Sequence, residues 1–184
     1  MELVLAREPE LLDRIFRLRA AVWSPLAPDG FATGRWTDEH DAHGVHWAVV
    51  DGGALVAAAR FCVHESLGEL PDERFFAGFG PETAPIGSLN RLVVAASHRR
   101  KGLAGRLDDA RLDFAAAKEC ATVACCTHDE HRVRMLLRRG FRVLGEAANV
   151  DPRALAEGRR PLVLVRRRGR GCASVEGGRG DGTG

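Results

Sequence analysis

Apolar residues recur along the chain at two spacings, one typical of helices and one typical of strands. Three segments, residues 9–22, 103–117 and 128–139, carry the helical spacing, in which apolar positions follow one another every three or four residues. We therefore predict an amphipathic helix over each of them. The apolar faces of the first two comprise Leu11, Leu12, Ile15, Leu18 and Val22, then Leu103, Leu107, Ala110, Phe114 and Ala117.

The ends of these helices carry local signals. Pro9 suits the first turn of a helix, because proline lacks the N–H that this turn leaves unpaired. Thr127 and Glu130, three residues apart, predict a capping box at the start of the third helix. Gly140 stands where a glycine commonly ends a helix.

Short apolar runs between these segments predict seven strands. Asp51-Gly52-Gly53 is a strong hairpin signal between the second and third strands. Residues 24–44 and 65–87 read as long loops, the latter with one helical turn near 72–76, and loops of this length are usually functional. The expected strands are 2–6, 46–50, 54–64, 88–95, 121–126, 141–146 and 161–168.

Length and composition indicate one globular domain. The 184 residues are 45% apolar and 28% charged, as in ordinary soluble chains. We expect the domain to cover residues 1–168, because residues 169–184 are mostly Gly, Arg and small polar residues that cannot build a core. This tail is expected to be disordered. No secretory signal and no run of about 18 apolar residues is present, so we expect a cytoplasmic protein without membrane contact.

Charge and cysteine usage narrow the possible partners. The net charge of +2 is too small to indicate nucleic acid, and the arginines at 159–170 lack the interleaved aromatic residues that stack on bases. The five cysteines lack Cys-x-x-Cys spacing, which favours reduced thiols and no zinc or other metal site. Cys125 and Cys126 should face opposite sides of one strand. The preference for arginine over lysine suggests a GC-rich bacterial genome.

One loop carries more chemistry than the rest of the chain. Residues 94–104, Val-Ala-Ala-Ser-His-Arg-Arg-Lys-Gly-Leu-Ala, lie between an apolar strand and a helix start. A helix start offers free N–H groups and the positive end of the helix dipole. Three cations precede Gly102, and glycine lets a ligand approach the backbone. The arrangement favours a phosphate or pyrophosphate site, although a basic turn that merely caps the helix has the same pattern.

The loop and the segments around it resemble the GNAT acyltransferases, the GCN5-related N-acetyltransferases. Their acyl-CoA loop reads Arg/Gln-x-x-Gly-x-Gly/Ala, and Arg99, Gly102 and Ala104 fill its fixed positions. Val94 stands upstream as expected, and Gly140-Phe141 is similar to the pair that closes the family's last helix. The resemblance covers roughly residues 88–146. It implies an α/β fold of one central mixed sheet with helices on both faces, and acetyl-CoA or another acyl-CoA as co-substrate without a metal.

The resemblance also implies where acyl-CoA binds. Pantetheine would lie where the strands 88–95 and 121–126 splay apart. Backbone N–H groups at 92–94 would polarise the thioester carbonyl. The residues expected to bind the co-substrate are Leu92, Val93, Val94, Arg99, Arg100, Lys101, Gly102, Leu103, Ala104 and Asp129.

The usual proton donor of this family is missing. Many members place a tyrosine four residues before the Gly-Phe glycine, where this chain has Leu136, and the chain has no tyrosine at all. Cys126, His128 or a water molecule must replace it, or no donor is needed. For both side chains a purely structural role is the commoner alternative.

The proton acceptor is equally open. Several relatives carry a carboxylate where this chain has Ser88. A solvated surface group is the commoner alternative for every candidate in plausible reach of the cleft, and the sequence does not choose among them. These candidates are Glu39, Asp41, His43, His64 and Glu65.

Two arginines interrupt apolar strands. Arg60 and Arg91 are costly to bury without partners, so each predicts either an ion pair with Asp38, Asp41 or Glu65, or a fork for a substrate carboxylate. The order of residues along the chain around these two arginines is similar to that in the ElaA-like branch of the family. It is more distantly similar to that in the acyl-homoserine-lactone and N-acyl amino acid synthases.

These features favour an N-acyltransferase that moves an acyl group, expected to be acetyl, from acyl-CoA to a small-molecule amine, with or without a carboxylate. One alternative is a long-chain acyltransferase of the autoinducer-synthase type. Another is a non-catalytic acyl-CoA-binding domain, which the missing tyrosine favours, and a third is nucleic-acid binding through residues 159–170. The protein could act as a monomer or as a homodimer.

Overall fold

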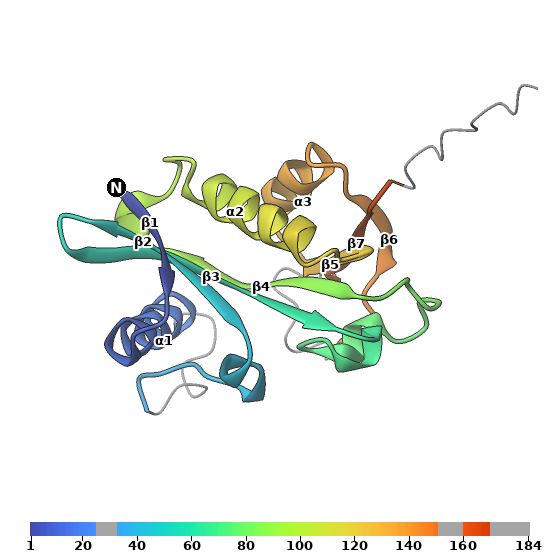
Figure 1. The fold of residues 1–184 in the computed structure, drawn as a ribbon, viewed down its shortest axis with the longest axis horizontal. Coiled ribbons are helices and arrows are strands. Elements are labelled where there is room, and N and C mark those ends of the chain that lie inside the picture. The colour runs from blue at the N-terminus through green and yellow to red at the C-terminus, as the bar shows by residue number, and fades with distance from the viewer. Residues whose placement is uncertain (25–32, 151–159, 170–184) are drawn as a thin grey trace, which may run out of the picture.

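The computed structural model describes residues 1–24, 33–150 and 160–169, which form one seven-stranded mixed sheet and three α-helices (Figure 1). The strand order across the sheet is β1-β2-β3-β4-β5-β7-β6. Neighbouring strands are antiparallel, except that β4 and β5 run parallel. The strands are β1 Glu2–Ala6, β2 Val45–Asp51, β3 Ala54–His64, β4 Ile86–Val94, β5 Thr122–Thr127, β6 Arg142–Glu146 and β7 Leu162–Arg167.

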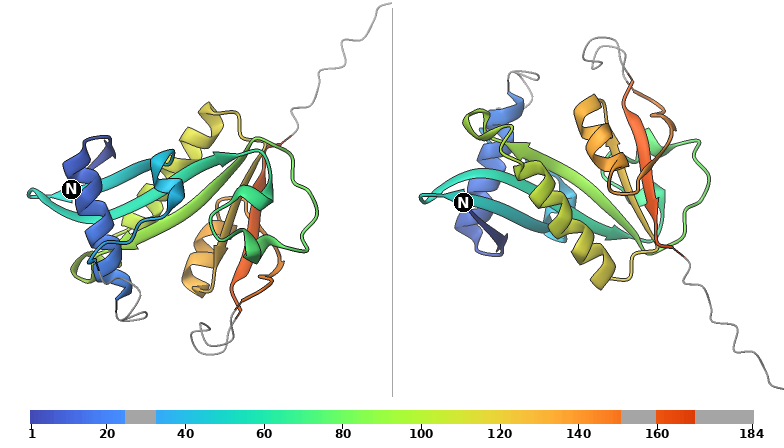
Figure 2. Two further views of the ribbon diagram at one scale, coloured as in Figure 1. Left: turned by 90° about the horizontal axis from the view of Figure 1, so that it is seen from below. Right: turned by 90° about the horizontal axis from the view of Figure 1, so that it is seen from above.

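Helices cover both faces of the sheet. α1 (Pro9–Trp23) lies on one face against β3 and β4, whereas α2 (Leu103–Ala117) and α3 (Glu130–Leu137) lie on the other (Figures 1 and 2). The element order and the α/β fold class that the sequence predicts are confirmed. Four 3₁₀ helices lie in the described loops: η1 Glu39–Ala42, η2 Leu67–Glu69, η3 Glu73–Phe76 and η4 Ala96–His98.

The hairpin between β2 and β3 forms where the sequence predicts it. Gly52 and Gly53 have φ angles of 54° and 82°. Two successive positive φ angles match the right-handed twist of the flanking strands, and only glycine adopts them without strain. Gly140, with φ of 82°, likewise follows the last helix as expected.

The start of α3 differs from the prediction. Asp129 is the N-cap residue, and its carboxylate accepts hydrogen bonds from the backbone N–H groups of His131 and Arg132. Thr127 accepts instead from the N–H of Asp129. The predicted capping box of Thr127 and Glu130 is therefore wrong, because a carboxylate two residues further along already binds the free N–H groups.

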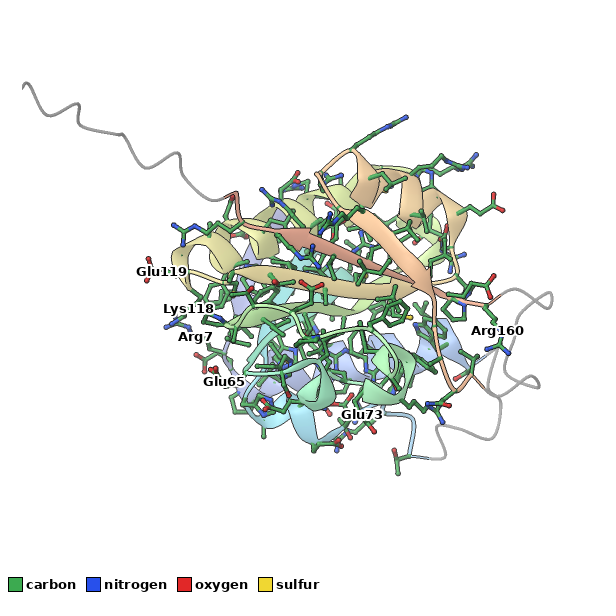
Figure 3. All side chains as sticks on the ribbon, turned by 90° about the vertical axis from the view of Figure 1, so that its right-hand side faces the viewer. Arg7, Glu65, Glu73, Lys118, Glu119 and Arg160 are labelled. Atoms are coloured by element: carbon green, nitrogen blue, oxygen red, sulfur yellow. The ribbon has the colours of Figure 1, made fainter. Side chains whose placement is uncertain are left out.

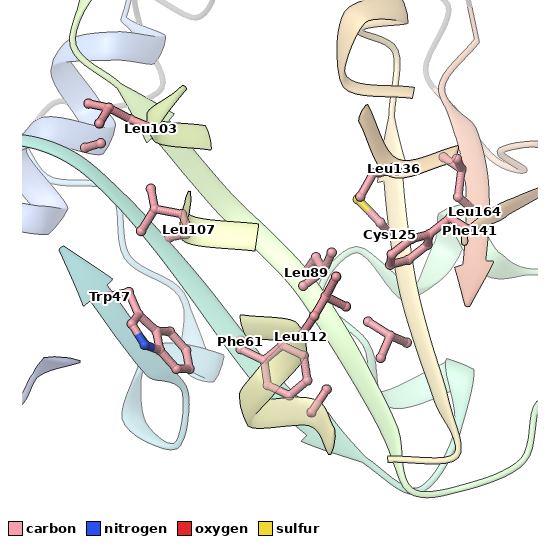
Figure 4. Packing of buried hydrophobic residues seen from close by; sticks show 14 of the residues in the cluster. Trp47, Phe61, Leu89, Leu103, Leu107, Leu112, Cys125, Leu136, Phe141 and Leu164 are labelled. Carbon is pink, nitrogen blue, oxygen red and sulfur yellow. The ribbon is translucent and has the colours of Figure 1, made fainter. Parts of the chain in front are cut away.

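The core occupies both faces of the sheet. The larger cluster lies beneath α2 and α3 and joins Leu103 and Leu107 to Leu136 and Cys125 (Figure 4). Cys126 packs against a second cluster on the other face, so the two cysteines point in opposite directions as predicted.

Helix α2 buries polar residues that its apolar spacing does not predict. Asp108 and Arg111 are fully buried, whereas Ala117 is exposed. The inner face of α2 is thus rotated away from the one that an apolar count indicates, because a buried ion pair occupies part of it.

The centre of the sheet is open. β4 and β5 pair only from Ile86 to Ser88, and beyond this point the strands separate (Figure 1). β4 also carries a bulge against β3, and Arg91 within it has a φ of 51°. A bulge leaves an extra residue out of the ladder and redirects its side chain. The splay that the resemblance implies is therefore present.

Within the described ranges, no helix is long and apolar enough to cross a membrane. The predicted disorder of residues 169–184 falls, apart from Gly169, outside the described residues.

Candidate functional site

A cavity of about 560 Å³ opens where β4 and β5 separate. β4 contributes Ser88 to Leu92, while β5 and the turn before α3 contribute Ala124 to Asp129. Trp23, Trp36, Phe75 and Phe76 line it from the side of α1 and the long loops. The cavity thus joins the start of α3 to an aromatic wall beside α1.

The basic loop leads from β4 into α2. The side chains of Arg99, Arg100 and Lys101 are exposed. Gly102 is the N-cap of α2 with φ of 76°, and no side chain caps the helix start. A Cβ atom on Gly102 would meet nothing within 4 Å, so the space beside the helix start is open. Free N–H groups, the helix dipole and three cations fit a phosphate ligand.

Arg60 lies in a buried ion-pair network. Its Nη1 atom is 2.5 Å from Oδ1 of Asp38 and 2.7 Å from Oδ1 of Asp41, and its Nε donates to Asn90. Arg19, also fully buried, donates to the same oxygen of Asp41 at 2.7 Å. For Arg60 the structure therefore shows the ion pair, one of the two alternatives that the sequence left open.

Arg91 belongs to the same network but lines the cavity. Its Nη2 and Nε atoms lie 2.6 Å and 2.9 Å from Oδ2 of Asp38, and its Nη1 lies 3.3 Å from Asp72. The guanidinium stands over the ring of Trp36 with 4.5 Å to the centroid, and Trp36 in turn contacts Trp23 edge to face. One wall of the cavity thus presents a cation held between a carboxylate and an indole.

The network sets the charges of its members. Burial would raise the pKa of Asp38, but hydrogen bonds and charges from Arg60 and Arg91 outweigh it and hold the pKa well below the ordinary 3.8. Burial and the charge of Arg19 lower the pKa of His46 to about 4. At neutral pH Asp38 is ionised and His46 is neutral.

A second buried ion cluster joins α2 to α3. Asp108 accepts hydrogen bonds from Arg111 of its own helix and from Arg132 in the first turn of α3. Arg111 also donates to the backbone carbonyls of Arg60 and Asn90, at 3.0 Å and 3.3 Å. Arg132 lines the cavity. This cluster fixes both helices over the point where β4 leaves β5.

Some of the residues expected near the thioester line the cavity, and others do not. Cys126, His128 and Asp129 line the cavity together with Leu92. Leu136 is fully buried beside Cys125 in the core (Figure 4) and does not line the cavity. Burial, chiefly, raises the pKa of the Cys126 thiol to about 12, so this thiol keeps its proton at neutral pH.

The expected proton acceptors lie in three different surroundings. Glu65 is exposed on the surface (Figure 3), and Glu39 is exposed on η1. Asp41 is held by Arg19 and Arg60. His43 and His64 come together with His40 into a ring cluster, and His64 is hydrogen-bonded to Ser88 of the cavity wall.

Several site residues are absent from the sequence-based prediction. Asp72 reaches Arg91 from a loop, and no local pattern signals that contact. Trp36 lies within the long loop 24–44 and carries no periodic signal. Asp108 and Arg111 are also absent from it, because a charged pair three residues apart is usual on an exposed helix face.

The fold is that of an acyltransferase. The chain belongs to the GNAT family, because the model of the acetyltransferase (GNAT) family matches residues 12–141. No curated protein sequence matches the chain.

Solved structures share the fold at low sequence identity. A CoA-dependent acyl-homoserine lactone synthase, BjaI, determined with SAM and isopentyl-CoA, is 20% identical, with a TM-score of 0.65 over 85% of this chain and 75% of its own. The AHL synthase LasI is 15% identical, with a TM-score of 0.67 over 90% of both chains. A Bacillus subtilis acetyltransferase in complex with CoA is 15% identical, with a TM-score of 0.62 over 91% and 98%.

Proposed function

We propose that the protein is an acyl-CoA-dependent N-acyltransferase that moves an acyl group, acetyl in the first instance, to a small amine bearing a carboxylate. The observation that carries this proposal is the cavity between β4 and β5, which meets the start of α3 at one end and Arg91 at the other. A donor and an acceptor can enter such a cavity from opposite sides and meet at β4.

The loop before α2 would hold the pyrophosphate of acyl-CoA. Arg99, Arg100 and Lys101 supply charge, and the backbone from Gly102 to Ala104 supplies N–H groups. The side chain of Val93 packs towards α1 and that of Val94 towards α2. At these positions it is therefore the backbone, with that of Leu92, that can polarise the thioester carbonyl.

Arg91 would bind the carboxylate of the acceptor. Its Nε and Nη2 are taken by Asp38, but among the described residues Nη1 meets only the half-exposed Asp72, at 3.3 Å. An acceptor carboxylate can replace Asp72 at this donor, and a guanidinium offers two N–H groups in a plane where an ammonium offers a point charge.

The leaving thiolate gains its proton from water or from His128. Leu136 lies in the core, and a Cys126 thiol with a pKa of about 12 holds its proton more tightly than a free thiol with a pKa of about 8.5. His128 is exposed at the rim of the cavity.

A second function, transfer of a longer acyl chain, is favoured by the apolar part of the cavity. Leu70, Phe75, Phe76 and Val150 line it, and these are more apolar contacts than an acetyl group needs. The structural likeness to acyl-homoserine lactone synthases supports the same possibility.

Thiol release tests these alternatives together. Acetyl-CoA and decanoyl-CoA are each incubated with amines that carry a carboxylate and with the matching amines that lack it. We expect release only with an amine present, and faster release when the amine bears a carboxylate. Binding of both acyl-CoAs without release would instead identify an acyl-CoA-binding domain, and faster release from decanoyl-CoA would favour the second function.

A further inference from the structure

Ser88 and His64 form a buried hydrogen-bonded pair behind the cavity wall. They lie on the neighbouring strands β4 and β3, with 5% or less of each residue exposed. The Nε2 atom of His64 is 3.0 Å from Oγ of Ser88, and Ser88 lines the cavity. Ser88 therefore stands between His64 and any molecule bound in the cleft.

Arg60 orients the amide of Asn90 towards Ser88. Arg60 can only donate, and its Nε lies 2.5 Å from Oδ1 of Asn90. This contact turns the amide nitrogen of Asn90 towards Ser88, to which it donates at 2.8 Å. Ser88 accepts that bond with one of its two lone pairs and keeps its single hydroxyl proton, which can be donated to Nε2 of His64. The neutral His64 ring then carries its own proton on Nδ1.

The surroundings keep His64 neutral. Burial and the neighbouring His40 and His43 lower its pKa from 6.5 to about 4, against an opposing effect of Glu69. Arg60, the other charged group facing it, acts in the same direction as burial. At neutral pH the Nε2 lone pair is thus available as a proton acceptor.

We propose that Ser88 and His64 take the proton of the acceptor amine during acyl transfer, an inference that rests on the proposed function. As the amine nitrogen bonds to the thioester carbon, its proton passes to Oγ of Ser88 while the Ser88 proton passes to Nε2 of His64. When the carbon–sulfur bond breaks, its electron pair leaves with sulfur as a thiolate. That thiolate takes one proton from water or His128, which balances the proton lost by the amine.

His64 packs against two further histidines, one of which reaches the surface. The ring centroids of His40 and His43 lie 5.7 Å and 6.4 Å from that of His64, and His43 is exposed. Among the described residues, Nδ1 of His40 is a buried polar atom without a hydrogen-bond partner. A water molecule at this atom would connect the cluster to the surface.

Four variants test the proposal: Ser88→Ala, Ser88→Thr, His64→Gln and the control His131→Gln, which changes an exposed histidine of α3. The readouts are thermal melting, CoA affinity by calorimetry, and kcat at saturating amine from pH 4 to 9. We expect kcat to fall at least tenfold in Ser88→Ala and His64→Gln with CoA affinity unchanged. Ser88→Thr, which keeps the hydroxyl, and His131→Gln should retain most of the native kcat.

The pH profile separates a proton acceptor from a structural pair. In the native protein, kcat should decline towards acid as His64 becomes protonated, and this limb should disappear in Ser88→Ala and in His64→Gln. Ser88→Ala removes only one oxygen atom, so its kcat and pH profile test the proposal even if His64→Gln fails to fold. An unchanged kcat, or a lower kcat with the same acid limb, would overturn the proposal. If the native protein transfers no acyl group to any amine, the proposed function itself fails.

Discussion

Asp38 and Arg91, 53 residues apart in the chain, are joined by two hydrogen bonds to one carboxylate oxygen, at 2.6 Å and 2.9 Å. The other oxygen of Asp38 binds Arg60. One side chain of the loop before β2 thereby holds the guanidinium groups of two central strands. The cavity wall depends on this carboxylate for its shape and for its charge.

Replacing Asp38 should destabilise the fold. Asp38→Asn leaves two largely buried guanidinium groups without their shared anion, and loss of one partner of such a pair costs about 3 kcal/mol or more of unfolding free energy. Chemical denaturation measures this loss. Asp109→Asn is the control, because its ion pair with Arg139 is exposed and should matter little.

The same carboxylate makes stability depend on pH. The pKa of Asp38 is lowered in the folded protein, so its stabilising effect is complete above the unfolded value near 4 and is lost as pH falls towards the folded pKa. The free energy of unfolding should therefore fall below about pH 4, and fall less steeply in Asp38→Asn. Parallel pH curves for the two proteins would contradict this assignment.

Gly102 tests the phosphate loop. Gly102→Asp should weaken CoA binding by about tenfold or more, because it places a negative charge beside the helix start where a phosphate would lie. Gly102→Asn is the matched control, since asparagine tolerates the positive φ about as well as aspartate does and adds no charge. Calorimetry that finds equal CoA affinities for the two folded variants would rule out an electrostatic site here.

Arg91→Lys should raise the KM for the acceptor about tenfold, roughly 1.4 kcal/mol, while the KM for acyl-CoA stays the same. A lysine cannot bind Asp38 and an acceptor carboxylate with the geometry of a guanidinium. Arg14→Lys, on the exposed face of α1, serves as the control. A lower melting temperature with unchanged acceptor kinetics would make Arg91 a structural ion-pair partner alone.

Leu136→Tyr should not supply the missing proton donor. Leu136 is fully buried, so a larger side chain with a hydroxyl group should cost about 1–3 kcal/mol of stability and leave kcat no higher. Leu136→Phe separates the effect of size from that of the hydroxyl. A higher kcat in Leu136→Tyr, but not in Leu136→Phe, would show that α3 can present this position to the thioester.

The sequence predicts the elements well because its local signals are strong. Paired glycines at 52 and 53 specify the hairpin, and Arg99 to Ala104 follow an apolar strand and open a helix. The contacts between residues of the site are not predicted by such local signals. Asp72 reaches Arg91 across a loop, and the bulge at Arg91 depends on pairing between β3 and β4, which periodicity does not encode.

The charged residues show why burial is hard to predict. Arg60 interrupts an apolar strand, which signals a buried cation, yet its partners Asp38 and Asp41 come from a distant loop. Asp108 and Arg111 look like an exposed pair until Arg132 of another helix is placed beside them. Long-range ion pairs decide both sites, and a single sequence does not specify them.

Following the acyl group itself tests the central claim most directly. Acetyl-CoA labelled with ¹³C in the acetyl group is incubated with the native protein and a carboxylate-bearing amine, and the masses of all products are measured. We expect the amine to gain one labelled acetyl group for each CoA thiol released, and Gly102→Asp to lower both in parallel. Thiol release without label on the amine, or no release at all, would contradict an N-acyltransferase.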